Sequence, residues 1–534
     1  MASFENQTGD TTLNAAGQFM ADWITQGIAQ SEIVPVVDVR TALTSERIVA
    51  ADTSKRGIGR LRALAADAGA GRIVWGAFYL RADSLVVQAN ISDAATGQII
   101  RALQPVSVSS RDPSGAVTQV SQNVLGALAL LYNSRNTEVL KEVKHPPSYQ
   151  AYQAFMIGMD LLVQYRSPEA AAQFRRAREL DSTFTQALLW EADADEQVGH
   201  WADADSVLRL AARSRELLGS YEQVFLDYRR AELAGDFGRA LDRARELSRI
   251  APGSEATFMV GAMALRLNRP NEALRALTQV DPDRGFLKGW DGFWGYPMQA
   301  HMMLDQLELA LADAREGRRR YPDSRQAVHQ EVTVLSAMGN EAEVDRLIDV
   351  EDGLPEAPGL PLPRTLRGAA TIFRGYGFDS AARRMAERAV SLLPNRDTSA
   401  AGDENRLILV EALYLLDRYA EARPIVLVME RRAPEDMTWL GYAGLLAARL
   451  GDRSAADSIM RRLANDRRPF AFGRGALWRA RIEAALGQDQ QAIALLRTGL
   501  AQGLAFDQAF ISVMPDFRNL AKYPEFRELF RPRG

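Results

Sequence analysis

Small and apolar residues recur at a nearly constant spacing from residue 148 onward. Alignment of the segments in which a turn precedes an apolar helix places alanine at nine positions and Val344 at a tenth. Successive positions lie 33 to 40 residues apart, a spacing that chance placement would rarely sustain over so much chain. The pattern therefore predicts an array of helical hairpins. The ten anchor positions are Ala170, Ala204, Ala240, Ala273, Ala310, Val344, Ala382, Ala422, Ala456 and Ala492.

Two helix-ending signals flank the anchors. Glycine recurs five residues before the anchor, where the first helix of a hairpin ends and a left-handed residue is favoured. Proline recurs twelve residues after it, where the second helix must stop. Seven residues after each anchor, small or apolar residues dominate again, and Glu351 is the one exception. The glycines are Gly199, Gly235, Gly339, Gly377, Gly451 and Gly487, and the prolines are Pro252, Pro322, Pro394 and Pro434.

This spacing resembles the tetratricopeptide repeat, a 34-residue unit with small residues at fixed places where two helices touch. In the first unit, counted from Ala151, the matching residues are Gly158, Ala170, Phe174 and Ala177. The resemblance implies a mainly α fold, with a tetratricopeptide-type α-solenoid of about ten hairpins over residues 148–510. Close contact between helix axes requires small facing residues, which explains the alanines.

The last segment, residues 511–534, has no further repeat behind it. It carries apolar residues such as Phe517, Leu520 and Phe526 among charged ones such as Arg518 and Glu525. A terminal hairpin leaves one apolar face uncovered, and an amphipathic closing segment would cover that face. We predict a terminal cap.

Residues 1–140 instead alternate helical and extended signals, which favours a separate small α/β domain ending before Pro146-Pro147. In the first predicted helix, Phe19, Trp23 and Ile24 share one stripe, and the last three predicted strands form a meander. The predicted helices span residues 15–30, 55–67 and 117–131, and the predicted strands span 33–39, 72–80, 84–91 and 98–103.

Three segments of this domain resemble the amino-terminal domain of the periplasmic protein TolB and its relatives: Phe4–Asp10, Trp75-Gly76 and Asp93–Gly97. In many bacteria such domains precede tetratricopeptide repeats. These relatives have a full strand before the Phe-Glu-Asn element, so the resemblance implies that the first strand is missing here. Similar regions form the distal part of membrane-tethered serine/threonine kinases or winged-helix transcription regulators, which implies an upstream module.

Composition narrows the possible functions. Hydrophobic residues make up 47% of the chain and charged residues 25%, which suits a folded core. The formal net charge of -4 offers no attraction for phosphate backbones, so we expect no nucleic-acid partner. The run Val124–Leu131 is far shorter than the ~20 residues of a membrane span. We therefore expect a soluble chain. Because both compartments tolerate chains without cysteine, the cytoplasmic and the periplasmic side of a bacterial cell envelope both stay possible.

No residue pattern points to catalysis. The four histidines lack the paired spacing of metal sites, and the glycine-rich segments 57–59 and 69–71 do not continue into a phosphate-binding loop. Acid pairs such as Asp193 with Glu196 are typical of solvated helix faces. We therefore predict no catalytic residue, no cofactor and no metal, and a protein that is not an enzyme. The histidines are His145, His200, His301 and His329.

Two further clusters have structural explanations. Trp290, Phe293, Trp294 and Tyr296 could form a ligand box, because aromatic residues are enriched in binding hot spots. In the repeat frame, however, Trp294 lies where core packing is favoured. The run 318–320 of three arginines is typical of a solvated helix end, where basic residues are favourable.

The leading hypothesis is a non-catalytic scaffold that binds a peptide or protein in the concave groove of the solenoid. The alternative is the sensory or regulatory region of a larger signalling protein. Side chains at the second, fifth and ninth positions of a repeat should face the groove. On the first three hairpins these are Tyr152, Phe155, Met159, Gln186, Leu189, Asp193, Glu222, Phe225 and Arg229.

Overall fold

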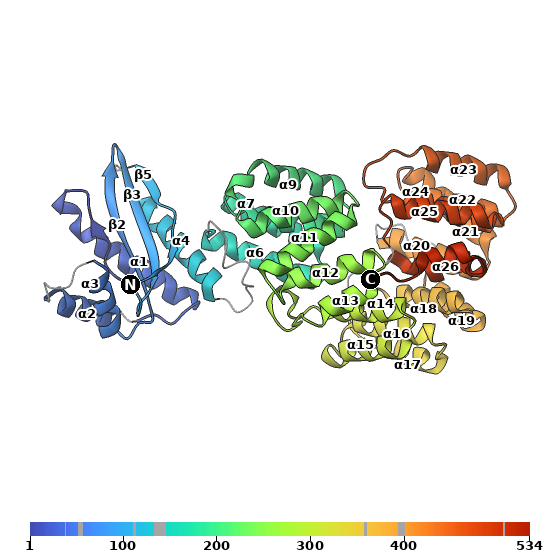
Figure 1. The fold of residues 1–534 in the computed structure, drawn as a ribbon, viewed down its shortest axis with the longest axis horizontal. Helices are drawn as coiled ribbons and strands as arrows, with labels where there is room; N and C mark the ends of the chain where they lie inside the picture. Colours follow the sequence, from blue (N-terminus) through green and yellow to red (C-terminus); the bar gives the residue numbers. More distant parts are fainter. Residues whose placement is uncertain are drawn as a thin grey trace. The chain divides into compact units, whose positions relative to one another are not determined.

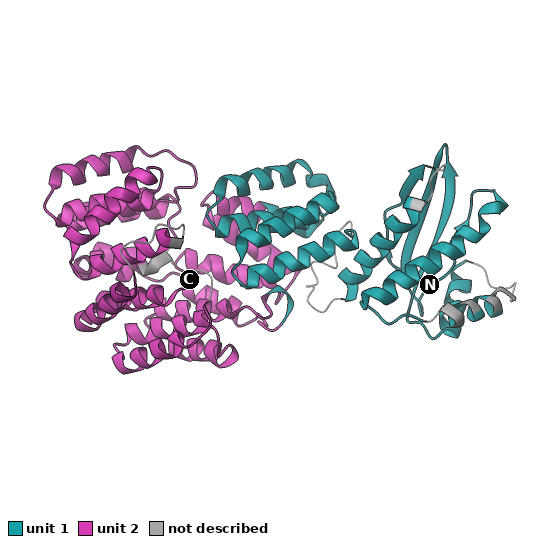
Figure 2. Ribbon diagram, turned by 180° about the vertical axis from the view of Figure 1, so that it is seen from behind, with its two compact units in different colours: residues 1–226, 284–286 teal, residues 227–283, 287–534 magenta. Residues whose placement is uncertain are grey.

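The chain folds into two units. A computed structural model describes residues 1–37, 39–51, 57–109, 114–132, 146–356, 360–393, 401–505 and 508–534. Unit 1 comprises residues 1–226 and 284–286, and unit 2 comprises residues 227–283 and 287–534 (Figure 2). Among the described helices, none combines the length and hydropathy that a membrane span needs.

Unit 1 begins with a five-stranded sheet flanked by helices (Figure 1). Because side chains alternate along a strand, β2 serves two cores: Val74 and Phe78 pack with α1 and α4, and Ile73 packs with α2 and α3. β2 and β3 pair antiparallel along their full length, β4 and β5 both pair with β3, and β1 runs parallel to β2. The elements are β1 (Glu5–Asn6), α1 (Asn14–Ser31), α2 (Val39–Ala51), α3 (Ile58–Asp67), β2 (Arg72–Arg81), β3 (Ser84–Asp93), β4 (Ile99–Ala102), β5 (Val106–Ser109) and α4 (Ser114–Tyr132).

Most elements predicted for this region are confirmed, and one is wrong. The predicted strand over residues 33–39 does not form: its residues 33–37 are irregular, and α2 begins at Val39. Ile33, Val34 and Val36 pack on the sheet core without pairing with a strand, so burial alone explains their apolar character. The helix α2 and the strands β1 and β5 were not predicted. Residues 55–56 of the second predicted helix lie outside the described residues.

The predicted stripe on α1 is also wrong in part. Phe19 and Trp23 are 56% and 49% exposed, whereas Met20, Ile24 and Ile28 form the buried face. The two exposed rings lie 6.0 Å apart on the surface of the helix. Both sets of residues recur at helical spacing, so hydrophobic periodicity could not tell them apart.

Ten helical hairpins follow within the described residues, each with a first and a second helix. They are α6 (Tyr149–Val163) with α7 (Ser167–Leu180), α8 (Thr185–Gln197) with α9 (Trp201–Arg213), α10 (Ser220–Leu233) with α11 (Phe237–Ile250), α12 (Glu255–Arg266) with α13 (Pro270–Leu277), α14 (Gly295–Met303) with α15 (Leu307–Arg320), α16 (Arg325–Ala337) with α17 (Glu341–Asp352), α18 (Leu362–Tyr376) with α19 (Asp379–Leu392), α20 (Ala401–Leu415) with α21 (Tyr419–Arg432), α22 (Met437–Arg449) with α23 (Arg453–Asn465), and α24 (Arg474–Ala485) with α25 (Asp489–Ala501).

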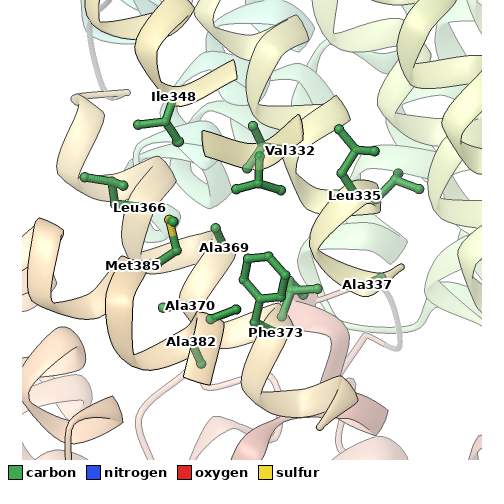
Figure 3. Packing of buried hydrophobic residues seen from close by; sticks show 14 of the residues in the cluster. Val332, Leu335, Ala337, Ile348, Leu366, Ala369, Ala370, Phe373, Ala382 and Met385 are labelled. Carbon is green, nitrogen blue, oxygen red and sulfur yellow. The ribbon is translucent and has the colours of Figure 1, made fainter. Parts of the chain in front are cut away.

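The anchor positions carry the close helix packing that the sequence predicts. All ten are 0% exposed. In the core shared by the sixth and seventh hairpins, Ala370 and Ala382 occupy the close contacts, while Phe373 and Met385 fill the space beside them (Figure 3). Small residues let helices approach, and larger neighbours restore packing density. The central sequence prediction is confirmed.

The hairpin turns follow one rule more strictly than the glycines suggested. The residue five positions before every anchor has a positive φ, including the six predicted glycines. In the other four hairpins the slot is filled by Tyr165, Asn268, Asp305 and Asp417, with φ between 57° and 60°. Asn and Asp tolerate this left-handed conformation better than most residues. Pro394 lies outside the described residues.

The carboxy-terminal segment packs on the last hairpin and continues beyond it. Phe517 of the 3-10 helix η6 (Pro515–Lys522) and Phe526 of α26 (Pro524–Phe530) are buried in one cluster with Leu496 of α25. Beyond α26, Asn268 donates a hydrogen bond to the carbonyl oxygen of Arg531 at 2.8 Å. The segment therefore also reaches the turn between α12 and α13, within unit 2.

Candidate functional site

A cleft of about 280 Å³ lies among the first helices of hairpins six to ten, within unit 2. We call it the polar cleft. Its walls come from α16, α18, α20, α22 and α24 together with residues 514–516, and we call the part around the buried Asp516 and Arg481 the closed end. Apolar side chains such as Ile372 and Leu415 lie between the polar groups. The polar lining residues are His329, Thr333, Arg364, Arg367, Thr371, Glu411, Tyr414, Tyr442, Arg481 and Asp516.

The closed end binds an acidic side chain of the chain itself. Arg481 Nε donates to Asp516 Oδ2 at 2.7 Å, the Tyr414 hydroxyl donates to Oδ1, and Arg449 Nη2 lies 3.5 Å from Oδ1. The Arg481 guanidinium also stacks on the Trp478 ring, 4.3 Å from its centroid. Burial raises the pKa of Asp516, but the two arginines and the tyrosine outweigh burial and hold it below the ordinary value. Asp516 is therefore a buried, fully engaged carboxylate.

The open part of the cleft is lined by paired charges. Tyr442 donates to Glu411 Oε1 at 2.9 Å, and Arg367 Nε lies 3.0 Å from Glu411 Oε2. Nearer the solvent, Arg364 donates to Glu404 at 3.1 Å, and both side chains are 44% exposed. Exposed pairs of this kind contribute little and exchange partners readily. The open part therefore offers both donors and acceptors to a ligand.

His329 forms part of the wall on α16. Its Nδ1 lies 3.3 Å from Thr365 Oγ1 on α18. Burial, followed by the positive charges of Arg367 and Arg364, lowers the pKa of His329 to about 4. The ring is therefore neutral near neutral pH and can act as a donor through one nitrogen and an acceptor through the other.

Two threonines contribute hydroxyl groups to the lining of the cleft. Thr333 Oγ1 donates to the carbonyl of His329 at 2.9 Å, and Thr371 Oγ1 donates to the carbonyl of Arg367 at 2.9 Å. Both hydroxyls are thus committed to their own helices. Among the described residues, no group of three or more His, Asp or Glu side chains is arranged to hold a metal.

Eight of the nine residues predicted to face a groove on the first three hairpins are buried, and Asp193 is partly exposed. Phe155 lies 5.0 Å from the Phe184 ring and 5.4 Å from the Phe174 ring, inside the core. Their contact with a partner stays a prediction. The buried residues are Tyr152, Phe155, Met159, Gln186, Leu189, Glu222, Phe225 and Arg229.

The two buried charges of this set have internal partners. Glu222 accepts hydrogen bonds from the Gly219 amide at 2.7 Å and from Thr185 Oγ1 at 2.9 Å, so it caps the start of α10. Burial raises its pKa despite these bonds. Arg229 donates to Glu232 at 2.7 Å. Both groups stabilise their own helix.

The same positional rule, continued along the chain, identifies much of the polar cleft. At these positions, hairpins six, seven, eight and ten carry polar residues that line the cleft or, in the case of Glu404, pair with a lining residue, whereas hairpins four, five and nine carry none. These residues were not among the predicted site residues, although the same spacing places them on the first helices. They are His329, Thr333, Arg364, Arg367, Thr371, Glu404, Glu411 and Arg481.

The other sequence candidates have structural roles. Trp294 packs against the aromatic cluster around Phe293, which confirms its predicted packing role, and the Arg320 guanidinium lies 5.2 Å from the centroid of its ring. The three arginines at 318–320 are not merely solvated, because each pairs with a glutamate. Hydrogen bonds from Arg319 and Arg320 lower the pKa of Glu316 to about 2. His145 lies outside the described residues.

These hairpins, with small anchors and left-handed turns, define a tetratricopeptide-type α-solenoid preceded by a small α/β domain. No protein-family model and no curated protein matches the sequence. Among solved structures, the chain is similar to a tetratricopeptide repeat protein from Parabacteroides merdae, with 14% identity over 56% of this chain and 99% of that one and a TM-score of 0.29. It is also similar to the tetratricopeptide domain of P58(IPK), with 13% identity over 65% and 98% and a TM-score of 0.17. The fold assignment rests on the hairpins themselves.

Proposed function

We propose that this chain is a non-catalytic interaction scaffold and that the polar cleft binds a segment of a protein partner. The observation that carries the proposal is the chain's own segment 514–516 at the closed end. There, side chains from α20, α22 and α24 bind the carboxylate of Asp516, while Met514 and Pro515 line the cleft. The first helices can therefore hold a peptide segment, and the open part has the same mixture of groups.

The chemistry of the open part suits a peptide better than a small metabolite. Arg364 and Arg367 can donate to carbonyl or carboxylate oxygens, and Glu411 can accept from amides. Apolar contacts from Ile372 and Leu415 suit an aliphatic side chain. A metabolite site is usually a more closed, mainly apolar pocket, whereas an extended peptide offers alternating polar and apolar groups.

Selection from a random peptide library displayed on phage, with the full chain as bait, tests this proposal. Selected peptides should bind the Arg367→Ala chain at least about tenfold more weakly, because a charged hydrogen bond contributes roughly 1.5–3 kcal/mol. Arg209→Ala is the matched control, since Arg209 is 62% exposed on α9 and pairs only at the surface with Asp205. Peptides that bind both variants like the original chain, or no selected peptide at all, would contradict the proposal.

We also propose that residues 1–140 form a TolB-amino-terminal-like domain, followed by repeats over 148–510 and a cap over 511–534. The parallel pairing of β1 with β2 and the meander that follows support it. The alternative function is the sensory or regulatory part of a larger signalling protein, such as a membrane-tethered kinase or a transcription regulator, on either side of the cell envelope. The reading frame upstream of Met1 would decide between the scaffold and this alternative.

A further inference from the structure

A continuous path of side chains joins a buried carboxyl group to the wall of the polar cleft. Glu351, on α17, is fully buried at the one repeat position where the sequence departs from small or apolar residues. Thr365 Oγ1 donates to Glu351 Oε1 at 2.9 Å and lies 3.3 Å from His329 Nδ1. Because Nδ1 faces Thr365, the opposite ring nitrogen, Nε2, is the one left to face a ligand.

The surrounding groups disfavour a charge at both ends of this path. They keep His329 neutral at the cleft and make ionisation of Glu351 unfavourable in the core. Arg325 Nη1 lies 3.7 Å from Glu351 Oε1, too far for a hydrogen bond, and the same guanidinium donates to the carbonyls of Leu354 and Pro355. Among the described residues, Glu351 Oε2 has no hydrogen-bond partner.

On the other side of the path, two arginines of α18 face His329. These are Arg364 and Arg367, and they are held in turn by Glu404 and Glu411 of α20. Their positive charge opposes a proton that would make the imidazole cationic. His329 can therefore change its tautomer more easily than its charge.

We propose that Glu351 is a positioning residue that acts through Thr365 and sets which hydrogen-bonding face His329 presents to the polar cleft. This inference rests on the proposed function, since it concerns the ligand of the same cleft. It deepens that function by naming what a ligand must offer at His329.

The ionised carboxylate can only accept, so the Thr365 hydroxyl donates to it. Thr365 Oγ1 then accepts from Nδ1–H of His329, and Nε2 is left as an acceptor. When Glu351 is protonated on Oε1, it donates to Thr365, and the Thr365 hydroxyl donates to Nδ1. The imidazole proton then lies on Nε2. Protonation on Oε2 instead would bury an O–H donor without a partner, an arrangement that native proteins avoid.

The expected change of the His329 tautomer lies close to neutral pH. Burial raises the pKa of Glu351 to about 7, although the Thr365 hydrogen bond and Arg325 oppose the rise. His329, whose pKa is about 4, stays uncharged across this range. Above the changeover, the ligand must donate to Nε2, as a peptide N–H or a side-chain amide does. Below it, the ligand must accept, as a carbonyl or carboxylate does.

Nuclear magnetic resonance of the full chain, labelled with ¹⁵N in histidine only, tests the inference without any ligand. With four histidines, the spectrum is sparse, and a His329→Gln chain assigns the signal. We expect the Nδ1–H tautomer at about pH 8.5 and the Nε2–H tautomer at about pH 6, with no imidazolium signature between them. A single tautomer throughout, or an ordinary histidine titration, would overturn the inference.

One variant and one control distinguish an effect of this path from a merely structural effect. Glu351→Gln cannot ionise, so the tautomer should stop changing with pH, whereas Thr365→Ser keeps the hydroxyl and should keep the change. Should Glu351→Gln retain the pH-dependent change, Glu351 is not its source. No peptide is present in this experiment. A negative result for the tautomer change therefore does not bear on the phage selection, and a negative phage selection does not bear on the tautomer change.

Discussion

The fifth position of the repeat differs sharply between the first three hairpins and the sixth and seventh. In the first three hairpins it holds Phe155, Leu189 and Phe225, all buried in cores. In the sixth and seventh hairpins it holds His329 and Arg367, which line the polar cleft. The repeat frame fixes where a side chain lies on its helix, but neighbouring side chains decide whether that place is core or cleft.

This difference makes side-chain type informative where position alone is not. An apolar residue at a potentially groove-facing place gains more by packing against the next hairpin than by staying in water. A charged residue at the same place needs a partner, either inside the core, as for Glu222 and Arg229, or in a polar cleft, as for Arg364 and Arg367. We infer that binding surfaces in this solenoid occur where the repeat frame carries consecutive charged residues.

The largest expected effect distinguishes the two regions directly. Phe155→Ala removes a fully buried ring and should lower the free energy of unfolding by roughly 3–5 kcal/mol. Arg367→Ala, at the equivalent position in the cleft, should cost less than about 1 kcal/mol, because its pair with Glu411 is partly solvated. Urea unfolding followed by circular dichroism measures both. Equal losses in the free energy of unfolding for the two variants would contradict the distinction between core and cleft.

Asp516→Ala should release the segment that closes the cleft. It leaves Arg481 and Arg449 without their carboxylate, and breaking such a buried pair costs roughly 3 kcal/mol. Because the folded pKa of Asp516 is lowered, its stabilisation is present above the ordinary carboxyl pKa and is lost as pH falls through the lowered value.

Limited proteolysis of residues 508–534 measures the release of this segment. Arg518→Ala removes only the exposed pair with Asp379 and is the control. Equal cleavage rates in the Asp516→Ala chain and the original chain would show that Asp516 does not hold the segment.

Glu351→Gln should change how stability depends on pH. The folded pKa of about 7 lies above the ordinary value of 4.5, so ionisation in the folded chain is unfavourable. Stability should therefore fall as pH rises from about 4.5 to about 7 and level off above that, by at most about 3 kcal/mol. The glutamine variant should lack this decline. Thermal unfolding at several pH values measures this. An equal loss of stability in both chains as pH rises would contradict the prediction.

The smallest expected effect concerns the hairpin turns. Gly451 has a φ of 80°, and a Cβ atom there would meet nothing within 4 Å, so Gly451→Ala should cost about 1 kcal/mol through backbone strain alone. Asp305→Gly, at the same position of the fifth hairpin, should stabilise the chain by less than about 1 kcal/mol, because Asp already tolerates a positive φ. Differences in melting temperature measure both, and a stabilised Gly451→Ala chain would contradict the turn assignment.

The repeats could be predicted from sequence because their signals are local: an alanine at a helix contact and a glycine at a turn each act within one hairpin. The irregular segment 33–37 could not, since its apolar pattern is the same whether it pairs with a strand or only packs on one. Tyr165 and Asp417 take left-handed turns that a glycine rule cannot find.

The cleft depends on contacts distant in sequence, which the repeat frame does not contain. The bond between Tyr414 and Asp516, for example, joins residues 102 positions apart. The repeat spacing did contain the positions of His329, Arg364 and Arg367, because the same rule places them on the first helices. The spacing rule also places Arg481 at the closed end, but it does not contain Asp516, the carboxylate that Arg481 binds.

Hydrogen exchange of the full chain, with and without a peptide selected on it, tests the central claim most directly. If the polar cleft is the partner surface, the peptide should slow amide exchange in α18 and α20 and leave α6 and α8 unchanged. Slower exchange confined to α6 and α8 would place the partner on the first hairpins and contradict the account.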